Sequence, residues 1–366
     1  MMMSLRRGIV TSLERKFKGR TDIMVKINEN EERAINYNNL TGEVEFNDEV
    51  ILNTTAVDLK LGTGGYHYVV ANLRYSEIPL HGQGHIMKLR YTPYQLKVLA
   101  AEEQTSPHHD VFKNFKSLEG LPVIVATLHS MLIPIACTLK QLNHRIRIAY
   151  IMTDGAALPI DFSNTVYELR SKKIIDHTIT IGHAFGGELE CVNIYNGLIA
   201  AKELTQCDVI IVSMGPGIVG TGTTYGFSGI EQGSILDAVD LLKGTAIAVP
   251  RISFADPRIR HKGMSHHSLT VLDKITRSKS KVVLPHLNKE QKGWISHQIQ
   301  TLGLDSKHEF IVEDGSILED ALQNFNLSVN SMGRSFSDDP AFFLTCSAAA
   351  TYVHKMRYGF EENLQV

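Results

Sequence analysis

Cysteine is scarce in this sequence, with four residues among 366. Cys137, Cys191, Cys207 and Cys346 form no CxxC pair and show no metal-type spacing, so neither a disulfide framework nor a zinc ribbon is expected. Most lie in apolar surroundings, where a free cysteine is usually a small buried side chain. The first residues, MMMSLRR, lack the apolar segment of a signal peptide. These absences favour a reducing, cytoplasmic environment.

An excess of charge of one sign is also missing. Lys and Arg number 37 and Asp and Glu 39, for a net charge of -2. No basic footprint points to nucleic acid or to an anionic membrane as a partner. The longest apolar stretch, residues 121–139, is interrupted by two prolines, a histidine and a serine. It therefore predicts a buried strand leading into a helix rather than a membrane span.

The hydrophobic content of 43% over 366 residues is enough for two folded domains. Residues 1–75 predict a small β domain, an antiparallel barrel or sandwich, because short β-rich segments alternate with turn residues. Six strands are expected, over residues 8–14, 22–28, 33–38, 49–53, 56–61 and 66–73. The run Gly62, Thr63, Gly64, Gly65 joins two of them and is interpreted as a hairpin turn rather than a phosphate loop.

Residues 76–117 are expected to form a connector with one helix near residues 93–103. From residue 118 to 366 the pattern changes, because seven apolar strand-length runs alternate with helix-length amphipathic segments. The runs are residues 121–128, 145–152, 174–181, 208–214, 245–250, 281–285 and 308–312. This alternation is typical of an α/β domain, a doubly wound, mostly parallel, Rossmann-like sheet.

A C-terminal helix is expected from about Asp338 to Tyr358, with Ser337 as its N-cap. Its Ala348, Ala349 and Ala350 would allow close packing against another surface. Together with the unpaired edges expected of the β domain, this face suggests a homodimer.

Ligands of open α/β sheets bind beyond the carboxyl ends of the strands, so the residues that follow each strand are the candidates for a site. The fourth strand is followed by a glycine-rich loop, and backbone amides of such a loop can converge on an anion. Its candidate ligand-binding residues are Gly215, Gly217, Gly220, Thr221, Gly222 and Thr223. The loop matches neither the Walker A motif nor the dinucleotide fingerprint. The alternative is a mobile loop at an interface.

Arginines follow the fifth strand, and Arg251 and Arg258 are the candidate clamps for a phosphate or carboxylate. The alternative for this stretch is a salt-bridged surface loop. His266 begins the next helix and is a candidate catalytic residue, with His183 after the third strand and Asp154 after the second. A metal site that also uses His129 is a further alternative, although no zinc-type spacing supports it.

Three segments resemble a family known as domain of unknown function 3866. They are residues 53–67, residues 214–223 with the glycine-rich loop, and residues 251–267 with the RISFADPR run. The resemblance spans most of the chain and implies a bacterial cytoplasmic protein. It brings no activity with it.

Three hypotheses follow for the function. The first is an enzyme that binds a phosphate-bearing or anionic small molecule through the glycine-rich loop and the arginines, with His266 or His183 transferring a proton. The second is a metal-assisted hydrolase that uses His129, Asp154, His183 and His266. The third is a non-catalytic ligand sensor. The cofactor, the substrate and the reaction are not specified by the sequence.

Overall fold

The computed structural model describes residues 3–61 and 64–359. The chain divides into two compact units. The smaller unit comprises Met1–Gln83 and Leu89–Val98, and the larger unit comprises Gly84–Lys88 and Leu99–Val366.

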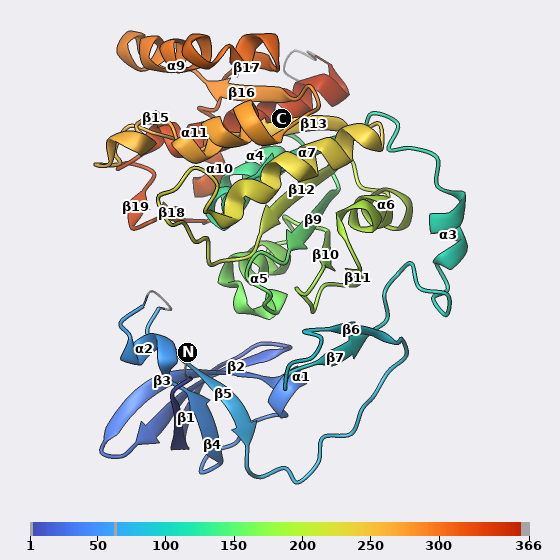
Figure 1. Ribbon diagram of the computed structural model, residues 1–366, viewed down its shortest axis with the longest axis vertical. Helices are drawn as coiled ribbons and strands as arrows, with labels where there is room; N and C mark the ends of the chain where they lie inside the picture. The colour runs from blue at the N-terminus through green and yellow to red at the C-terminus, as the bar shows by residue number, and fades with distance from the viewer. Residues whose placement is uncertain (1–2, 62–63, 360–366) are drawn as a thin grey trace. The chain divides into compact units, whose positions relative to one another are not determined.

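Five strands of the smaller unit close into a barrel in the order β1-β2-β3-β5-β4 (blue in Figure 1). They are β1 (Leu5–Lys16), β2 (Arg20–Ile27), β3 (Asn30–Tyr37), β4 (Glu49–Asn53) and β5 (His67–Asn72). Alternate side chains such as Val25, Ile27 and Leu52 fill the barrel, because successive residues of a strand point to opposite faces. The predicted barrel is confirmed. It is not wholly antiparallel, since β3 and β5 pair in parallel.

The strand expected at residues 56–61 is wrong, because α2 (Thr55–Asp58) and a turn take its place. The Thr54 hydroxyl donates to the Asp58 carboxylate over 2.8 Å, and such local side-chain bonds compete with a sheet ladder. Another short helix, α1 (Asn38–Thr41), links β3 to β4. Gly62 and Thr63 of the expected hairpin turn lie outside the described residues.

The connector contains β6 (Ile86–Lys88), β7 (Leu96–Val98) and α3 (His109–Asn114). The helix expected at residues 93–103 is wrong. Turns closed by backbone bonds from Thr92 to Leu89 and from Gln95 to Thr92 precede β7, so the chain is already extended where the helix was expected.

The larger unit is built on an eight-stranded sheet in the order β11-β10-β9-β12-β8-β13-β16-β17. Every neighbouring pair in it is parallel. The strands are β8 (Pro122–Ala126), β9 (Ile148–Thr153), β10 (His177–Ile181), β11 (Leu189–Cys191), β12 (Val209–Met214), β13 (Thr245–Val249), β16 (Lys281–Pro285) and β17 (Glu309–Glu313). The doubly wound α/β fold is confirmed.

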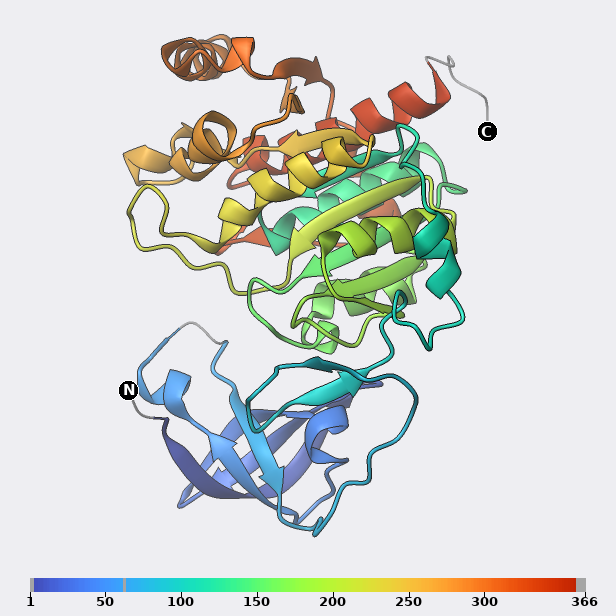
Figure 2. The ribbon, with the colours of Figure 1, turned by 45° about the vertical axis from the view of Figure 1, so that its right-hand side comes forward.

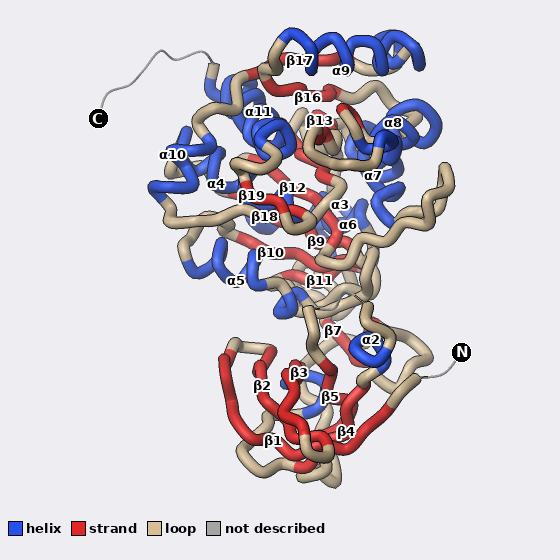
Figure 3. Tube along the Cα trace, turned by 90° about the vertical axis from the view of Figure 1, so that its left-hand side faces the viewer, coloured by secondary structure: helices blue, strands red, loops and turns tan. Residues whose placement is uncertain are grey.

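Helices cover both faces of this sheet, as Figure 3 shows. One face packs against α4 (Leu132–Leu142), α5 (Asn164–Ser171), α10 (Leu318–Asn324) and α11 (Pro340–Tyr358). The other packs against α6 (Ile194–Thr205), α7 (Glu231–Leu241), α8 (His266–Thr270) and α9 (Lys289–Leu302); α6 and α7 lie side by side there in Figure 2. Along β8, Ile124 faces the first core and Val123 and Val125 face the second, so all three apolar side chains are buried.

The structure corrects two helix boundaries. One of the helix-length amphipathic segments predicted between the strands covers residues 188–204. Its first residues form β11, and α6 begins only where the Asn193 side chain accepts from the backbone N–H of Asn196. α11 begins at Pro340 without a side-chain N-cap. Ser337 is not its cap, and the carboxylate of Asp339, the residue before the helix, instead accepts from Ser253 and Arg334.

The apolar stretch 121–139 forms β8 and most of α4, as expected. Among the helices of the described residues, none combines the length and the apolar character needed to cross a bilayer. The homodimer prediction relied on open strand edges of the β domain and on an exposed alanine face of the C-terminal helix. Within the described residues the barrel is closed, and Ala348, Ala349 and Ala350 are fully buried in the core. The homodimer stays a prediction.

Two short hairpins complete the larger unit. β14 (Ile252–Ser253) pairs with β15 (Gly263–Met264), and β18 (Asn330–Ser331) pairs with β19 (Arg334–Ser335).

Candidate functional site

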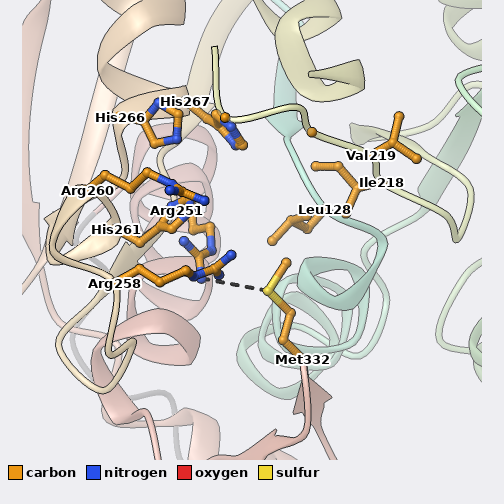
Figure 4. Close-up of a pocket in the computed structure, with 12 residues that line it drawn as sticks. Leu128, Ile218, Val219, Arg251, Arg258, Arg260, His261, His266, His267 and Met332 are labelled. Atoms are coloured by element: carbon orange, nitrogen blue, oxygen red, sulfur yellow. Dashed lines mark hydrogen bonds between the residues drawn. The ribbon is translucent and has the colours of Figure 1, made fainter. Parts of the chain in front are cut away.

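A cavity of about 200 Å³ lies in the larger unit, beyond the carboxyl ends of β12, β8 and β13. These strands are adjacent in the middle of the sheet. On one side of them lie β9, β10 and β11, and on the other side lie β16 and β17, so the strand order reverses here. Such reversals of strand order are the usual ligand sites of open α/β sheets. The lining residues are Leu128, Ile218, Val219, Gly220, Gly222, Arg251, Arg258, Arg260, His261, His266, His267 and Met332 (Figure 4).

Arg251 is the most buried cation of the cavity, with 5% of its side chain exposed. Its Nη2 donates to Asp256 Oδ2 over 2.8 Å. No described group accepts a hydrogen bond from its Nε or Nη1, although both atoms are buried. Burial lowers the pKa of this guanidinium from its ordinary value. A buried donor without an acceptor is costly, so Arg251 has unmet hydrogen-bonding capacity beside the cavity.

Asp256 holds this cluster of arginines together from a fully buried position. Arg258 donates to it through Nε over 3.0 Å and Nη2 over 2.8 Å, and Arg334 lies 3.6 Å from the same carboxylate. The bonds from Arg258, with those from Arg251, hold the Asp256 pKa well below its usual range. One carboxylate thus faces three guanidinium groups, which leaves a surplus of positive charge.

Further positive charge comes from Arg260, for which no ion pair occurs within residues 3–61 and 64–359. Arg334 is balanced by a second carboxylate, Asp339, at 3.2 Å. Among the described residues that line the cavity, none is acidic. Its walls therefore favour an anion.

Three histidines form a compact cluster on the same side, with ring centroids 4.1 Å apart for His266 and His267, 4.9 Å for His261 and His266, and 5.4 Å for His261 and His267. Ser265 lies 2.7 Å from His261 Nδ1 and caps α8 by accepting from the backbone N–H of His267. The ring of His267 also stacks on Phe227 at 4.0 Å.

These imidazoles are neutral at neutral pH. Burial, with Arg251 and Arg258 beside it, lowers the pKa of His261 to about 3. Burial and His266 lower the pKa of His267 to about 4. The pKa of His266 is lowered by burial and by Arg260. The buried Nε2 of His266 has no hydrogen-bond partner among the described groups. A neutral ring with an unused nitrogen can accept a proton.

The glycine-rich loop contributes two of its predicted residues, Gly220 and Gly222, to the cavity. A Cβ at Gly220 would lie 3.4 Å from Cε1 of His267, so the loop packs closely on that ring. Thr221 and Thr223 do not line the cavity. Their hydroxyls bond each other over 2.9 Å and close the loop on itself through Gly226.

Gly215 and Gly217 also lie outside the cavity lining. A Cβ at Gly215 would meet the sulfur of Met152 at 3.2 Å, and one at Gly217 would meet Ala156 at 3.4 Å. This part of the loop therefore faces β9 and the segment after it rather than the arginines.

Of the three predicted catalytic residues, His266 lines the cavity and the other two do not. Asp154 accepts from the backbone N–H of His183 over 3.0 Å, and both residues follow strands β9 and β10 in the other half of the sheet. Glu231 is close to Asp154 and accepts from Thr153 over 2.5 Å; burial raises its pKa to about 7. Asp154, His183 and Glu231 do not line the arginine cavity.

His129 is engaged in the interior of the fold. Its Nε2 lies 2.6 Å from Ser163 Oγ and its Nδ1 lies 3.2 Å from the Met214 carbonyl. Burial lowers its pKa to about 4. Within the part of the chain that the structure describes, no three His, Cys, Asp or Glu side chains are grouped to hold a metal ion. The described side chains thus offer no cluster that supports the metal-dependent alternative.

Sequence reasoning missed several lining residues. Arg260 and His261 belong to the same basic run as Arg258, so that run was their signal. Leu128, Ile218 and Met332 carried no signal, because apolar side chains in loops do not indicate a ligand site until the fold places them beside one.

A family model described as "Protein of unknown function (DUF3866)" matches residues 33–350 of the chain. A search of the curated proteins finds no match.

Proposed function

The chain belongs to the DUF3866 family of proteins of unknown function, and from its site we propose that it binds a phosphate-bearing or otherwise anionic small molecule. The cavity beyond β12, β8 and β13 is the proposed binding site. The observation that carries this proposal is Arg251, whose buried Nε and Nη1 have no acceptor among the described groups. An anionic oxygen would accept from them, and charge-assisted bonds of this kind are strong.

The proposed ligand contacts follow from the lining. Arg251 and Arg258 act as clamps, and Arg260 adds charge at an exposed position. Gly220 and Gly222 bring the backbone of the glycine-rich loop into the lining of the same cavity. Gly222 has a φ of +79°, which favours glycine.

We further propose that the protein is an enzyme in which His266 is the general base. In hydrolysis of a phosphate monoester, a water attacks the phosphorus and His266 takes the proton of the water. The bond from phosphorus to the leaving oxygen breaks, and His266 then returns the proton to that oxygen. The lowered pKa keeps His266 unprotonated and ready to accept at neutral pH. The arginines stabilise the charge on the phosphoryl oxygens.

Sulfate titration tests the binding proposal, because sulfate has the shape of a phosphoryl group and does not change its charge near neutral pH. Arg251→Lys keeps the charge but removes the planar donors, so binding should weaken by about 2–5 kcal/mol. Arg260→Ala should cost about 1 kcal/mol or less, since the side chain is exposed. Arg277→Ala, an exposed arginine outside the cavity, is the matched control and should change nothing. Equal affinity of wild type and Arg251→Lys would refute the assigned clamp.

Turnover of p-nitrophenyl phosphate tests the chemistry, because its leaving group needs no protonation. His266→Asn should lower the rate by about 10²–10⁴ while sulfate affinity stays within a few fold. If the wild type binds sulfate and turns over no phosphate ester, the catalytic part of the proposal fails and a sensor is the better description.

A further inference from the structure

The cavity has two chemically different walls, which restrict the ligand beyond its charge. The arginines and histidines form one wall, and Leu128, Ile218, Val219 and Met332 form the other, as Figure 4 shows. We infer that the ligand carries an apolar body next to its anionic group, so that it is an alkyl or aryl phosphate or carboxylate rather than a sugar phosphate. This inference rests on the proposed anion site.

The apolar wall extends from the interior to the surface. Leu128 is buried, with 4% of its surface exposed, whereas Val219 and Met332 are 66% and 52% exposed. Exposed large apolar side chains beside a charged cavity lose unfavourable contact with water when an apolar group covers them. A hydroxylated body would instead meet a wall whose side chains hold no hydrogen-bonding group except a weakly accepting thioether.

Met332 provides the second, independent observation. It lies between β18 and β19, where Met332 has a φ of +53° and Gly333 a φ of +80°. A two-residue turn with both φ values positive favours Asn or Gly at its first position, so methionine is a costly choice for the turn itself. Its sulfur lies 3.7 Å from Nη2 of Arg251. The hairpin thus holds a flexible apolar side chain over the buried cation.

Ser331 ties this hairpin to the segment that follows β8, because its hydroxyl lies 3.0 Å from that of Ser130, four residues after the strand. Asn330 accepts from the backbone N–H of Gly333 over 3.0 Å and closes the turn. The position of Met332 is therefore set by polar contacts outside the cavity. A substitution at Met332 can change the wall without removing the hairpin.

Calorimetric titration of the full chain with paired ligands tests the inference. Butyl phosphate is compared with glycerol phosphate, and hexanoate with gluconate, so that each pair shares its anionic group. A methylene that becomes fully buried strengthens binding by about fourfold, and contact with one wall gives about half of that free energy. We therefore expect the apolar member of at least one pair to bind about tenfold or more tightly than its hydroxylated partner.

Two variants test whether the apolar wall causes the preference for the apolar ligand. Met332→Asn suits the turn and should keep the fold while reducing the preference for the apolar ligand to about threefold or less. Val219→Ser should act in the same direction. Val312→Ser is the matched control, because Val312 is 55% exposed on β17 and does not line the cavity; it should leave the preference unchanged.

The outcomes separate the two proposals. If sulfate binds through Arg251 but both members of each pair bind equally, the apolar ligand is refuted and the anion site stands. A preference that persists in Met332→Asn and Val219→Ser would also refute it, because another surface would then hold the apolar body. If neither sulfate nor any paired ligand binds, the proposed function itself fails.

Discussion

Protonation of His261 is expected to destabilise the larger unit as the pH falls. His261 is buried, and its pKa is lowered to about 3 by burial and by Arg251 and Arg258. In the unfolded chain the pKa returns to about 6.5. The unfolded state therefore binds the proton first, so the contribution of the neutral ring is complete above about pH 6.5 and is lost as the pH falls toward 3.

The magnitude follows from the two values. Between pH 7 and pH 5 the unfolded state gains about 2 kcal/mol from binding this proton, while the folded state gains almost nothing. The difference of about 2 kcal/mol is nearly the same for a folded-state pKa of 3 or of 4, because both lie below pH 5. Because the ring borders a cavity, we take 2 kcal/mol as the upper limit.

Urea unfolding at pH 7 and pH 5 measures this effect. The His261→Asn variant keeps a polar group near Ser265 and has no titrating ring. From pH 7 to pH 5 the free energy of unfolding should therefore fall more for the wild type than for this variant, by up to about 2 kcal/mol. His297→Asn, at an exposed position on α9, is the control and should follow the wild type. Identical pH dependence of wild type and His261→Asn would refute the assignment of a neutral, buried ring.

Bound sulfate should offset part of the loss of stability at low pH, because an anion beside the imidazoles favours their protonated forms. Sulfate affinity of the wild type should therefore rise from pH 7.5 to pH 5.5, and an affinity that is flat or falls would contradict the placement of the anion. Gly220→Ala should weaken sulfate binding with little loss of stability, since its methyl group enters the cavity at ordinary contact distance from His267. Gly222→Ala should instead cost about 1 kcal/mol of stability, because the φ of Gly222 is +79°. Thermal melts with and without sulfate distinguish the loss of binding from the loss of stability. Asp256→Asn should destabilise the fold by about 3–5 kcal/mol, as it leaves buried Arg251 without its counter-ion, and a melting temperature equal to that of the wild type would exclude this role. Light scattering tests the homodimer, and a mass near 41 kDa, the value for one chain of 40.8 kDa, would exclude it.

Much of the fold was determined by local sequence pattern. Apolar runs such as residues 209–214 and 245–249 are buried on both faces, so an uninterrupted apolar strand was readable without the structure. The errors fell where local polar contacts outweighed propensity. Thr54 and Asp58 turn an apolar segment into a helical turn, and Arg334 binds the carboxylate of Asp339, just before α11.

The candidate site could be predicted from the sequence only in part. The sequence shows which residues follow each strand, but it does not show the order of the strands in the sheet. Arg251, Arg258 and His266 share the cavity because they follow β13, the neighbour of β8. Asp154 and His183 satisfied the same rule of position, yet they follow strands in the other half of the sheet. That order arises from long-range packing of helices on both faces, and so does the approach of Met332 to Arg251 across 81 residues of chain. Local pattern thus determined which side chains end strands, and tertiary packing decided which of them meet.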